Sequence, residues 1–260
     1  MLHCLAFDIE TIPDTELGRR LYGLDGLDDA AVAEFMFFRR RQQTGRDFLP
    51  LPQQRVVAIS VVLRSGEGLR VWSLGEAESP EHELIERFFD GIERFSPVLV
   101  SWNGSGFDLP VLHYRALRHG VAAPRYWETG DQDSAFRWNN YLNRFHARHT
   151  DLMDVLSGYQ AAGRARLEEV ALMLGLPGKM GMSGAEVWPA WQRGEIAAIR
   201  QYCETDALNT YLVYLEFERL RGGLDATGLA AEQARVRETL ADTDAPHLQA
   251  FLAAWQAGEA

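Results

Sequence analysis

The chain has 260 residues and a formal net charge of −11, and hydrophobic residues make up 47% of it. This length allows one large α/β domain or two small ones, each with a sizeable core. The acidic balance excludes a protein that coats nucleic acid through a broad basic face, although an enzyme acting on one chain end remains compatible with it.

Other features of the composition define the environment that we expect for the chain. No apolar run is long enough to span a bilayer, so we expect no membrane partner. Cys4 and Cys203 both lie in apolar segments, which favours a reducing cytoplasm over a disulfide framework.

Hydrophobic periodicity, interrupted by glycine- and proline-rich turns, predicts strands and helices in chain order. Strands are expected at residues 2–7, 56–63, 69–74 and 97–102, the middle two joined by a turn from Ser65 to Gly68. Helices are expected at residues 28–43, 81–95, 108–119, 166–174 and 195–221, with a helical tail beyond Gly223. Ser79 and Pro80 are expected as the cap and first-turn residue of the second helix. Residues 126–149 show weak periodicity and predict an irregular insertion.

This order of elements, a strand hairpin followed by strand–helix units, predicts one mixed-sheet α/β domain with helical additions. The first predicted strand runs into Asp8 and Glu10. Because side chains alternate along a strand, both carboxylates project from the same face and could share a metal ion. A solvated strand end is the alternative interpretation of this pair.

Two further segments carry acids. Residues 103–108 follow an apolar strand and end in Asp108 at a predicted helix start, where a carboxylate also serves as an ordinary cap. Tyr202 and Asp206 are four residues apart on a predicted helix and therefore share a face. A phenol with an ordinary pKa near 10 is a poor base, so positioning a water molecule is the role that Tyr202 suits.

Separated carboxylates that converge on one cleft suit phosphodiester hydrolysis. This reaction needs an activated water molecule, neutralised phosphate oxygens and a stabilised leaving oxygen, and two hard cations about 4 Å apart supply all three. Mg²⁺ and Mn²⁺ prefer carboxylate oxygens and water as ligands.

Taken together, the three motifs resemble those of the DEDD superfamily of 3′–5′ exonucleases in its tyrosine variant. They are Phe7-Asp8-Ile9-Glu10-Thr11, Trp102-Asn103-Gly104-Ser105-Gly106-Phe107-Asp108 and Tyr202-Cys203-Glu204-Thr205-Asp206. Within the superfamily, the chain looks most like the predicted exonucleases related to the proofreading domain of family-B DNA polymerases. The histidine variant would place histidine at position 201, which is Gln201 here.

The resemblance implies a ribonuclease-H-like fold, with a mixed five-stranded sheet flanked by helices. It implies an exonuclease domain over residues 1–222 and a helical tail over residues 223–260, packed on the domain or extending from it. It also implies two cations, Mg²⁺ or Mn²⁺. Asp8 would bridge both, Glu10 and Asp206 would hold the first, Asp108 would hold the second largely through water, and Tyr202 would hydrogen-bond the nucleophile.

Four more residues are candidates for substrate contacts. Thr11 could touch the terminal 3′ hydroxyl, and Asn103 could line the cleft. Phe107 could pack on a terminal base or sugar, with plain core packing as the alternative. Lys179 lies in a glycine-rich loop and could hold a phosphate, or it could be an exposed side chain on a flexible connector.

Two weaker signals remain. His146 and His149 superficially resemble a zinc pair, but cysteines are absent around them and the segment is not clearly helical. The insertion also interleaves arginine with aromatic residues, which would suit either a single-strand path or a solvated face. The residues concerned are Arg137, Trp138, Tyr141, Arg144 and Arg148.

The leading hypothesis is a stand-alone, metal-dependent 3′–5′ exonuclease that acts on the 3′ end of nucleic acid, with single-stranded DNA as the expected substrate. An alternative from another class is a nucleic-acid-binding or scaffold module that has the same fold without turnover. A third hypothesis is the same chemistry on RNA, because the acids do not discriminate between the two sugars.

Overall fold

The computed structural model describes residues 2–66 and 68–258, and its centre is a five-stranded sheet in the order β3-β2-β1-β4-β5. Strand β1 (Cys4–Pro13) is central, antiparallel to β2 (Gln54–Ser65) and parallel to β4 (Val98–Ser101). Strand β3 (Gly68–Ser73) extends the antiparallel side and β5 (His149–Asp151) the parallel side. This mixed sheet confirms the predicted α/β fold class and has the architecture expected of a ribonuclease-H-like fold.

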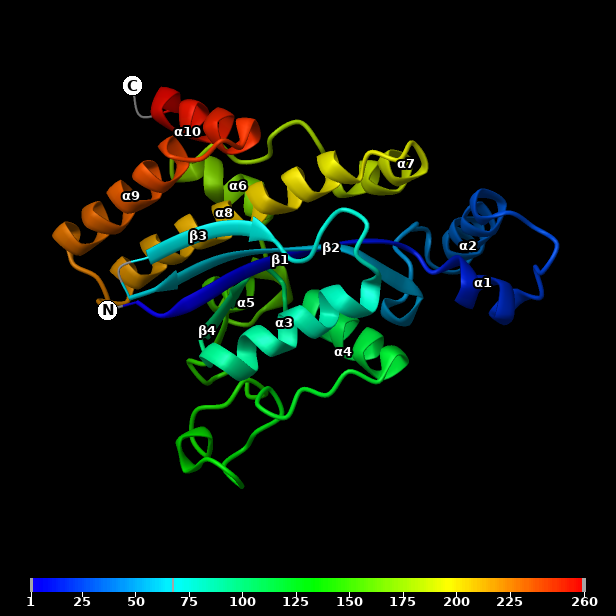
Figure 1. Cartoon of the computed structure of the whole chain (residues 1–260), viewed down its shortest axis with the longest axis horizontal. Helices are drawn as coiled ribbons and strands as arrows, with labels where there is room; N and C mark the ends of the chain where they lie inside the picture. The colour runs from blue at the N-terminus through cyan, green and yellow to red at the C-terminus, as the bar shows by residue number, and fades with distance from the viewer. Residues whose placement is uncertain (1, 67, 259–260) are drawn as a thin grey trace.

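Helices cover both faces of the sheet (Figure 1). One face carries α8 (Ile196–Leu220), with α9 (Ala226–Ala241) and α10 (Pro246–Gly258) beside it, and the other carries α3 (Glu81–Phe95) and α4 (Asp108–His119). Among the described residues, none of the helices has both the length and the apolar character needed to cross a membrane. The shorter or peripheral helices are α1 (Thr15–Tyr22), α2 (Asp29–Thr44), η1 (Leu51–Gln53), η2 (Ser134–Phe136), α5 (Leu152–Leu156), η3 (Ala161–Gly163), α6 (Leu167–Met173), η4 (Gly184–Glu186) and α7 (Val187–Gln192).

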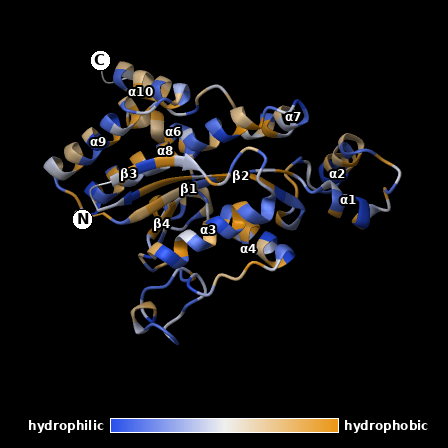
Figure 2. Cartoon of the chain, viewed as in Figure 1, coloured by the Kyte–Doolittle hydropathy of each residue, from blue (hydrophilic) through white to orange (hydrophobic). Residues whose placement is uncertain are grey.

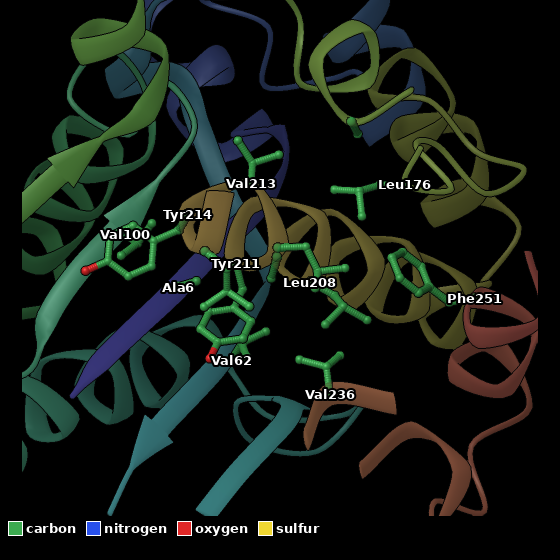
Figure 3. Packing of buried hydrophobic residues seen from close by; sticks show 14 of the residues in the cluster. Ala6, Val62, Val100, Leu176, Leu208, Tyr211, Val213, Tyr214, Val236 and Phe251 are labelled. Carbon is green, nitrogen blue, oxygen red and sulfur yellow. The ribbon is translucent and has the colours of Figure 1, made fainter. Parts of the chain in front are cut away.

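Hydrophobic clusters on both faces of the sheet hold these layers together, and the central strands are coloured mostly hydrophobic in Figure 2. On the α8 face, Leu208 and Tyr211 lie beside Val62 of the sheet and Val236 of α9 (Figure 3). Burial of these large side chains is the main force that fixes α8 against the sheet, at about 1.5–3 kcal/mol for each aliphatic side chain.

Polar contacts add to this attachment of the C-terminal helices. Arg64 of β2 forms a bidentate pair with Glu232 of α9, with both N–O distances at 2.7 Å. His247 of α10 lies 2.7 Å from Glu204 of α8, measured from Nε2 to Oε2. The helices that follow Gly222 are therefore packed on the α8 face of the sheet.

Most of the predicted elements are confirmed, and the differences have local causes. The first strand continues through Asp8 and Glu10 to Pro13, because the alternation continues with Ile9 and Ile12, both buried against neighbouring layers. The predicted strand end at Phe7 is therefore wrong.

The predicted capping role of Ser79 is also wrong, since Pro80 occupies the N-cap position of α3. The hydroxyl of Ser79 accepts instead from the backbone N–H of Glu76. Helices α1 and α7 were not predicted, whereas the irregular character of residues 126–149 is confirmed apart from the single turn η2. Glu67, in the predicted hairpin turn, lies outside the described residues.

Candidate active site

The site begins on β1, where Asp8 and Glu10 face the α8 layer. Asp8 pairs with Ser60 of β2 and Glu10 with Ala58, and a register shift follows between Glu10 and Thr11. The intervening side chains project to the opposite face and join the cluster beneath α3. The apolar side of the strand therefore fixes the direction in which both carboxylates point.

Asp108 joins the two β1 carboxylates from the first turn of α4. Phe107 is the N-cap residue, and the Asp108 side chain is only 3% exposed. The backbone N–H groups of Asp108 itself and of Ile9, which lies between the two acids of β1, lower the pKa of this carboxylate in opposition to burial. The second predicted motif therefore lies against the first.

Helix α8 supplies the third motif. Tyr202 and Asp206 lie one helical turn apart, both are buried, and the nearby Tyr202 phenol lowers the pKa of the Asp206 carboxylate in opposition to burial. Between them, Cys203 points at β1, where its thiol donates to the backbone carbonyl of Asp8 at 3.3 Å. This thiol contact, which the sequence did not predict, ties α8 directly to the acidic strand.

The four carboxylates disfavour one another's ionisation. Burial raises the pKa of Asp8, and the negative charges of Glu10, Asp108 and Asp206 raise it further. Burial likewise raises the pKa of Glu10, that of Asp108 to about 7 and that of Asp206 to about 6. Nearby cations would stabilise the ionised form of a cluster of this kind.

Among the described residues, one side-chain cation, that of Lys179, reaches the cluster. Lys179 follows α6 in a glycine-rich loop, and its Nζ donates to the Tyr202 hydroxyl at 3.1 Å. Its positive charge lowers the pKa of both Glu10 and Asp206, in opposition to burial. Lys179 is therefore part of the acidic site rather than a side chain on an isolated connector.

The donor set fits divalent cations. Asp8, Glu10 and Cys203 each offer an atom, and the three atoms lie within 4.8 Å of one another. Burial raises the pKa of the Cys203 thiol and keeps it protonated, so the oxygen donors are the available ligands. Oxygen ligands suit Mg²⁺ and Mn²⁺.

The residues predicted to contact the substrate differ in what they contact in this structure. The Thr11 hydroxyl donates to Gln54 Oε1 at 2.9 Å, so it is already engaged in this structure. Phe107 is half-buried against the α3 cluster and lies 5.4 Å from the exposed Phe48 ring, measured between centroids. Phe107 thus packs in the core and also forms an aromatic pair with Phe48 on its exposed side. Phe48 was not predicted as a site residue.

Asn103 is held by a residue that the sequence did not single out. The backbone N–H groups of Asn103 and Ser105 donate to the two carboxylate oxygens of Asp151, each at 2.9 Å. Asn103 adopts a left-handed conformation with φ of 64°, which asparagine tolerates better than most residues. Asp151, at the end of β5, therefore fixes the loop that leads into Asp108.

The insertion does not present the arginine and aromatic side chains as one surface. Tyr141 is 2% exposed and Arg148 packs over the Phe136 ring at 3.7 Å from the centroid, whereas Arg137, Trp138 and Arg144 are exposed. The imidazoles of the predicted zinc pair have separate partners: His149 bonds to Ser101, and His146 accepts from the backbone N–H of Asn140.

Comparison with known proteins identifies the class. The chain belongs to the family of predicted 3′–5′ exonucleases related to the exonuclease domain of PolB, whose model matches residues 46–255. That span contains Asp108, Tyr202 and Asp206, whereas Asp8 and Glu10 precede it.

Individual relatives are similar over part of their length. A DNA polymerase of Archaeoglobus fulgidus is 27% identical over 139 residues, which are 52% of this chain and 17% of the polymerase. A DNA polymerase of Pyrococcus glycovorans is 28% identical over 182 residues, which are 66% of this chain and 23% of the polymerase. The chain thus spans less than a quarter of the polymerases that it resembles.

Proposed function

We propose that the protein is a metal-dependent 3′–5′ exonuclease that releases nucleotides from the 3′ end of single-stranded DNA. The observation that carries the proposal is the convergence of four acids from β1, α4 and α8, each with a raised pKa; Glu10, Asp108 and Asp206 are buried and Asp8 is partly exposed. Such a concentration of carboxylates is costly to fold, and it suits a site completed by divalent cations.

In this proposal Asp8, Glu10, Asp108 and Asp206 would hold two Mg²⁺ or Mn²⁺ ions. When bound, such cations lower the pKa of a water molecule and neutralise the phosphate oxygens under attack. The chain's own residues then have to bind the terminal nucleotide, position the attacking water and keep bulk solvent away from the reacting phosphate.

Tyr202 and Lys179 are assigned to positioning. Burial and the neighbouring carboxylates raise the pKa of Tyr202, so the phenol stays protonated and can donate or accept a hydrogen bond without acting as a base. Lys179, in contact with that phenol, would hold a phosphate oxygen of the substrate by charge. Asn103 and Phe107 would line the cleft for the terminal nucleotide, and Thr11 could reach the 3′ hydroxyl only by releasing Gln54.

The family and the named polymerase relatives support DNA as the substrate of this proposal. RNA remains the alternative substrate, and a module that binds without turnover remains the alternative function. We further propose that residues 1–222 form the nuclease domain and that the C-terminal helices brace α8 behind the site.

The proposal is tested with purified protein and a 5′-labelled single-stranded oligonucleotide in a titration of Mn²⁺. We expect a ladder that shortens from the 3′ end, and its loss in Asp206→Ala. Glu238→Ala, which removes an exposed carboxylate on α9, is the matched control and should remain active. Binding without any product at all metal concentrations would favour the non-catalytic module, and faster digestion of RNA would favour the exoribonuclease.

A further inference from the structure

A groove lies on the face of the sheet opposite the acidic site. It has a volume of about 450 Å³ and lies between α3 and the side of the sheet formed by β2 and β3. Its floor is apolar and includes Leu5, Val61, Leu63 and Phe88. The volume falls within the range of natural ligand sites.

Arginines dominate the charged part of this groove. Arg70 of β3 and Arg87 and Arg94 of α3 line it, and Asp90 is the one acid among the described residues of the lining. This is a local reversal of sign in a chain whose net charge is −11. A cationic rim around an apolar floor complements a ligand that carries both negative charge and a hydrophobic group.

Two of the three guanidinium groups are available to such a ligand. Arg70 lies over the Trp72 ring at 5.0 Å and Arg94 over the Phe95 ring at 5.5 Å, both measured to the ring centroid. Among the described residues neither forms an ion pair, whereas Arg87 bonds to Glu83. Arg70 and Arg94 are exposed, so their charge is not neutralised from within the part of the chain that the structure describes.

Gly91 keeps the groove open. It lies in the interior of α3 and lines the groove, and a Cβ built on it meets no atom within 4 Å. Neither a positive φ nor close packing requires glycine there, although glycine in a helix interior costs stability relative to alanine. The absence of a side chain leaves the groove open at this point.

We propose that this groove is a docking site for an acidic, extended peptide segment of a partner protein that inserts one large apolar side chain. The apolar side chain would fill the floor, and the carboxylates would pair with Arg70 and Arg94. Because β3 is the last strand on its side of the sheet, the peptide can also lie along that edge. The site is separate from the acids and would bring the protein to a partner without blocking them.

A nucleic acid strand is the competing occupant, since arginine and tryptophan also bind bases and phosphates. The peptide is favoured for two reasons. The floor is built from aliphatic side chains and Phe88, which suit an inserted apolar side chain better than a polar base edge. The groove also lies on the far side of the sheet from the carboxylates, away from the path of a substrate strand.

The test uses fluorescein-labelled decapeptides of Asp and Gly with one Phe, Leu or Ile, read by fluorescence polarisation with the full chain. We expect binding that weakens at least about tenfold when the apolar residue is replaced by Ser or when Asp is replaced by Lys. Arg70→Glu combined with Arg94→Glu should weaken binding by a similar factor. Arg219→Glu, at an exposed arginine on α8 that does not line the groove, should leave binding unchanged.

Gly91→Gln separates binding from folding. It fills the groove with a side chain that favours helix, so we expect a higher thermal midpoint together with lost peptide binding. Peptide binding that survives Gly91→Gln, or a Kd weaker than about 1 mM for every peptide, overturns the proposal. Labelled oligothymidine in metal-free buffer is the comparison: if it binds and the groove variants abolish its binding, the groove is a nucleic acid site.

Discussion

The Nζ atom of Lys179 lies 3.1 Å from the hydroxyl of Tyr202. Lys179 is the only lysine of the chain, and it approaches the acids from the loop that precedes α7, opposite β1. Its contact places a positive charge beside the Tyr202 phenol, which lies near Asp206, Glu10 and Asp8. Lys179 thus supplies a positive charge, and Tyr202 a hydrogen-bond donor, side by side for the proposed reaction.

Lys179→Met should impair hydrolysis and shift its pH dependence. Lys179 lowers the pKa of Glu10 and Asp206, so its removal should raise both and move the acidic limb of the rate profile to higher pH. Rates between pH 5 and 9 at saturating Mg²⁺ measure the shift. Lys179→Arg keeps the charge and should retain the wild-type limb; an unshifted limb in Lys179→Met would contradict the assigned electrostatic role.

Tyr202→Phe should lower kcat by roughly 10- to 100-fold with a smaller change in KM, because a misplaced water molecule costs rate without removing substrate contacts. The ring is buried, so the substitution preserves packing and the fold. Single-turnover kinetics separate this step from product release. An unchanged single-turnover rate would show that the phenol positions nothing in the reaction.

The stability of the metal-free protein should fall as the pH rises, through Asp108. Its pKa is raised from 3.8 to about 7 by burial, so the folded chain holds this proton more tightly than the unfolded chain. The contribution of protonated Asp108 to the free energy of unfolding is complete below about pH 4 and is lost as the pH approaches 7. At about 1.4 kcal/mol for each pKa unit, the loss is up to about 4 kcal/mol.

Asp108→Asn removes the pH dependence of stability that Asp108 causes. Comparison with the wild type then separates this contribution from those of other titrating groups. The stability gained by the variant over the wild type, measured by urea unfolding in EDTA, should increase from pH 5 to pH 8. Added Mg²⁺ should make the wild type more stable than the variant, because it stabilises only the wild type. A gain that stays constant with pH would mean that Asp108 is ionised throughout.

Asp151→Ala should act on the site without contacting the substrate. The carboxylate accepts the backbone N–H groups of Asn103 and Ser105, and its loss leaves both donors without that partner, at a cost of about 1–3 kcal/mol. We also expect a higher KM, because the loop lines the proposed cleft. Asp131→Ala, on an exposed turn of the insertion, is the control, and equal KM values in the two variants would reject the positioning role.

Much of the fold was predictable because its main elements carry strong local signals. The helices predicted at residues 81–95 and 28–43 are confirmed as α3 and α2, because their patterns are local in sequence. The motifs around Asp8, Asp108 and Asp206 were found for the same reason, since each lies on or beside a strand or helix with a local pattern. The expectation that the three motifs lie together came from the family resemblance.

The missed features depend on contacts distant in sequence. Asp151 ends a strand of three residues, too short for any periodicity, and its partners lie 46 and 48 residues earlier. The Cys203 thiol reaches a carbonyl 195 residues away. The groove beneath β3 likewise depends on which strand ends the sheet, and the strand order is a property of the whole fold.

The alternation of side chains along β1 couples the two faces of the sheet. Phe7 and Ile9 anchor the strand in the cluster beneath α3, while Asp8 and Glu10 project to the opposite side. A shift of β1 by one residue in its pairing register would exchange the two sets. The carboxylates would then be buried in the hydrophobic cluster, and the aromatic and aliphatic side chains would move to the opposite face. The position of the acids thus depends on the packing of Phe7 and Ile9 on the opposite face, so a poorly fitting Phe7 replacement should also displace the acids and reduce the proposed nuclease activity.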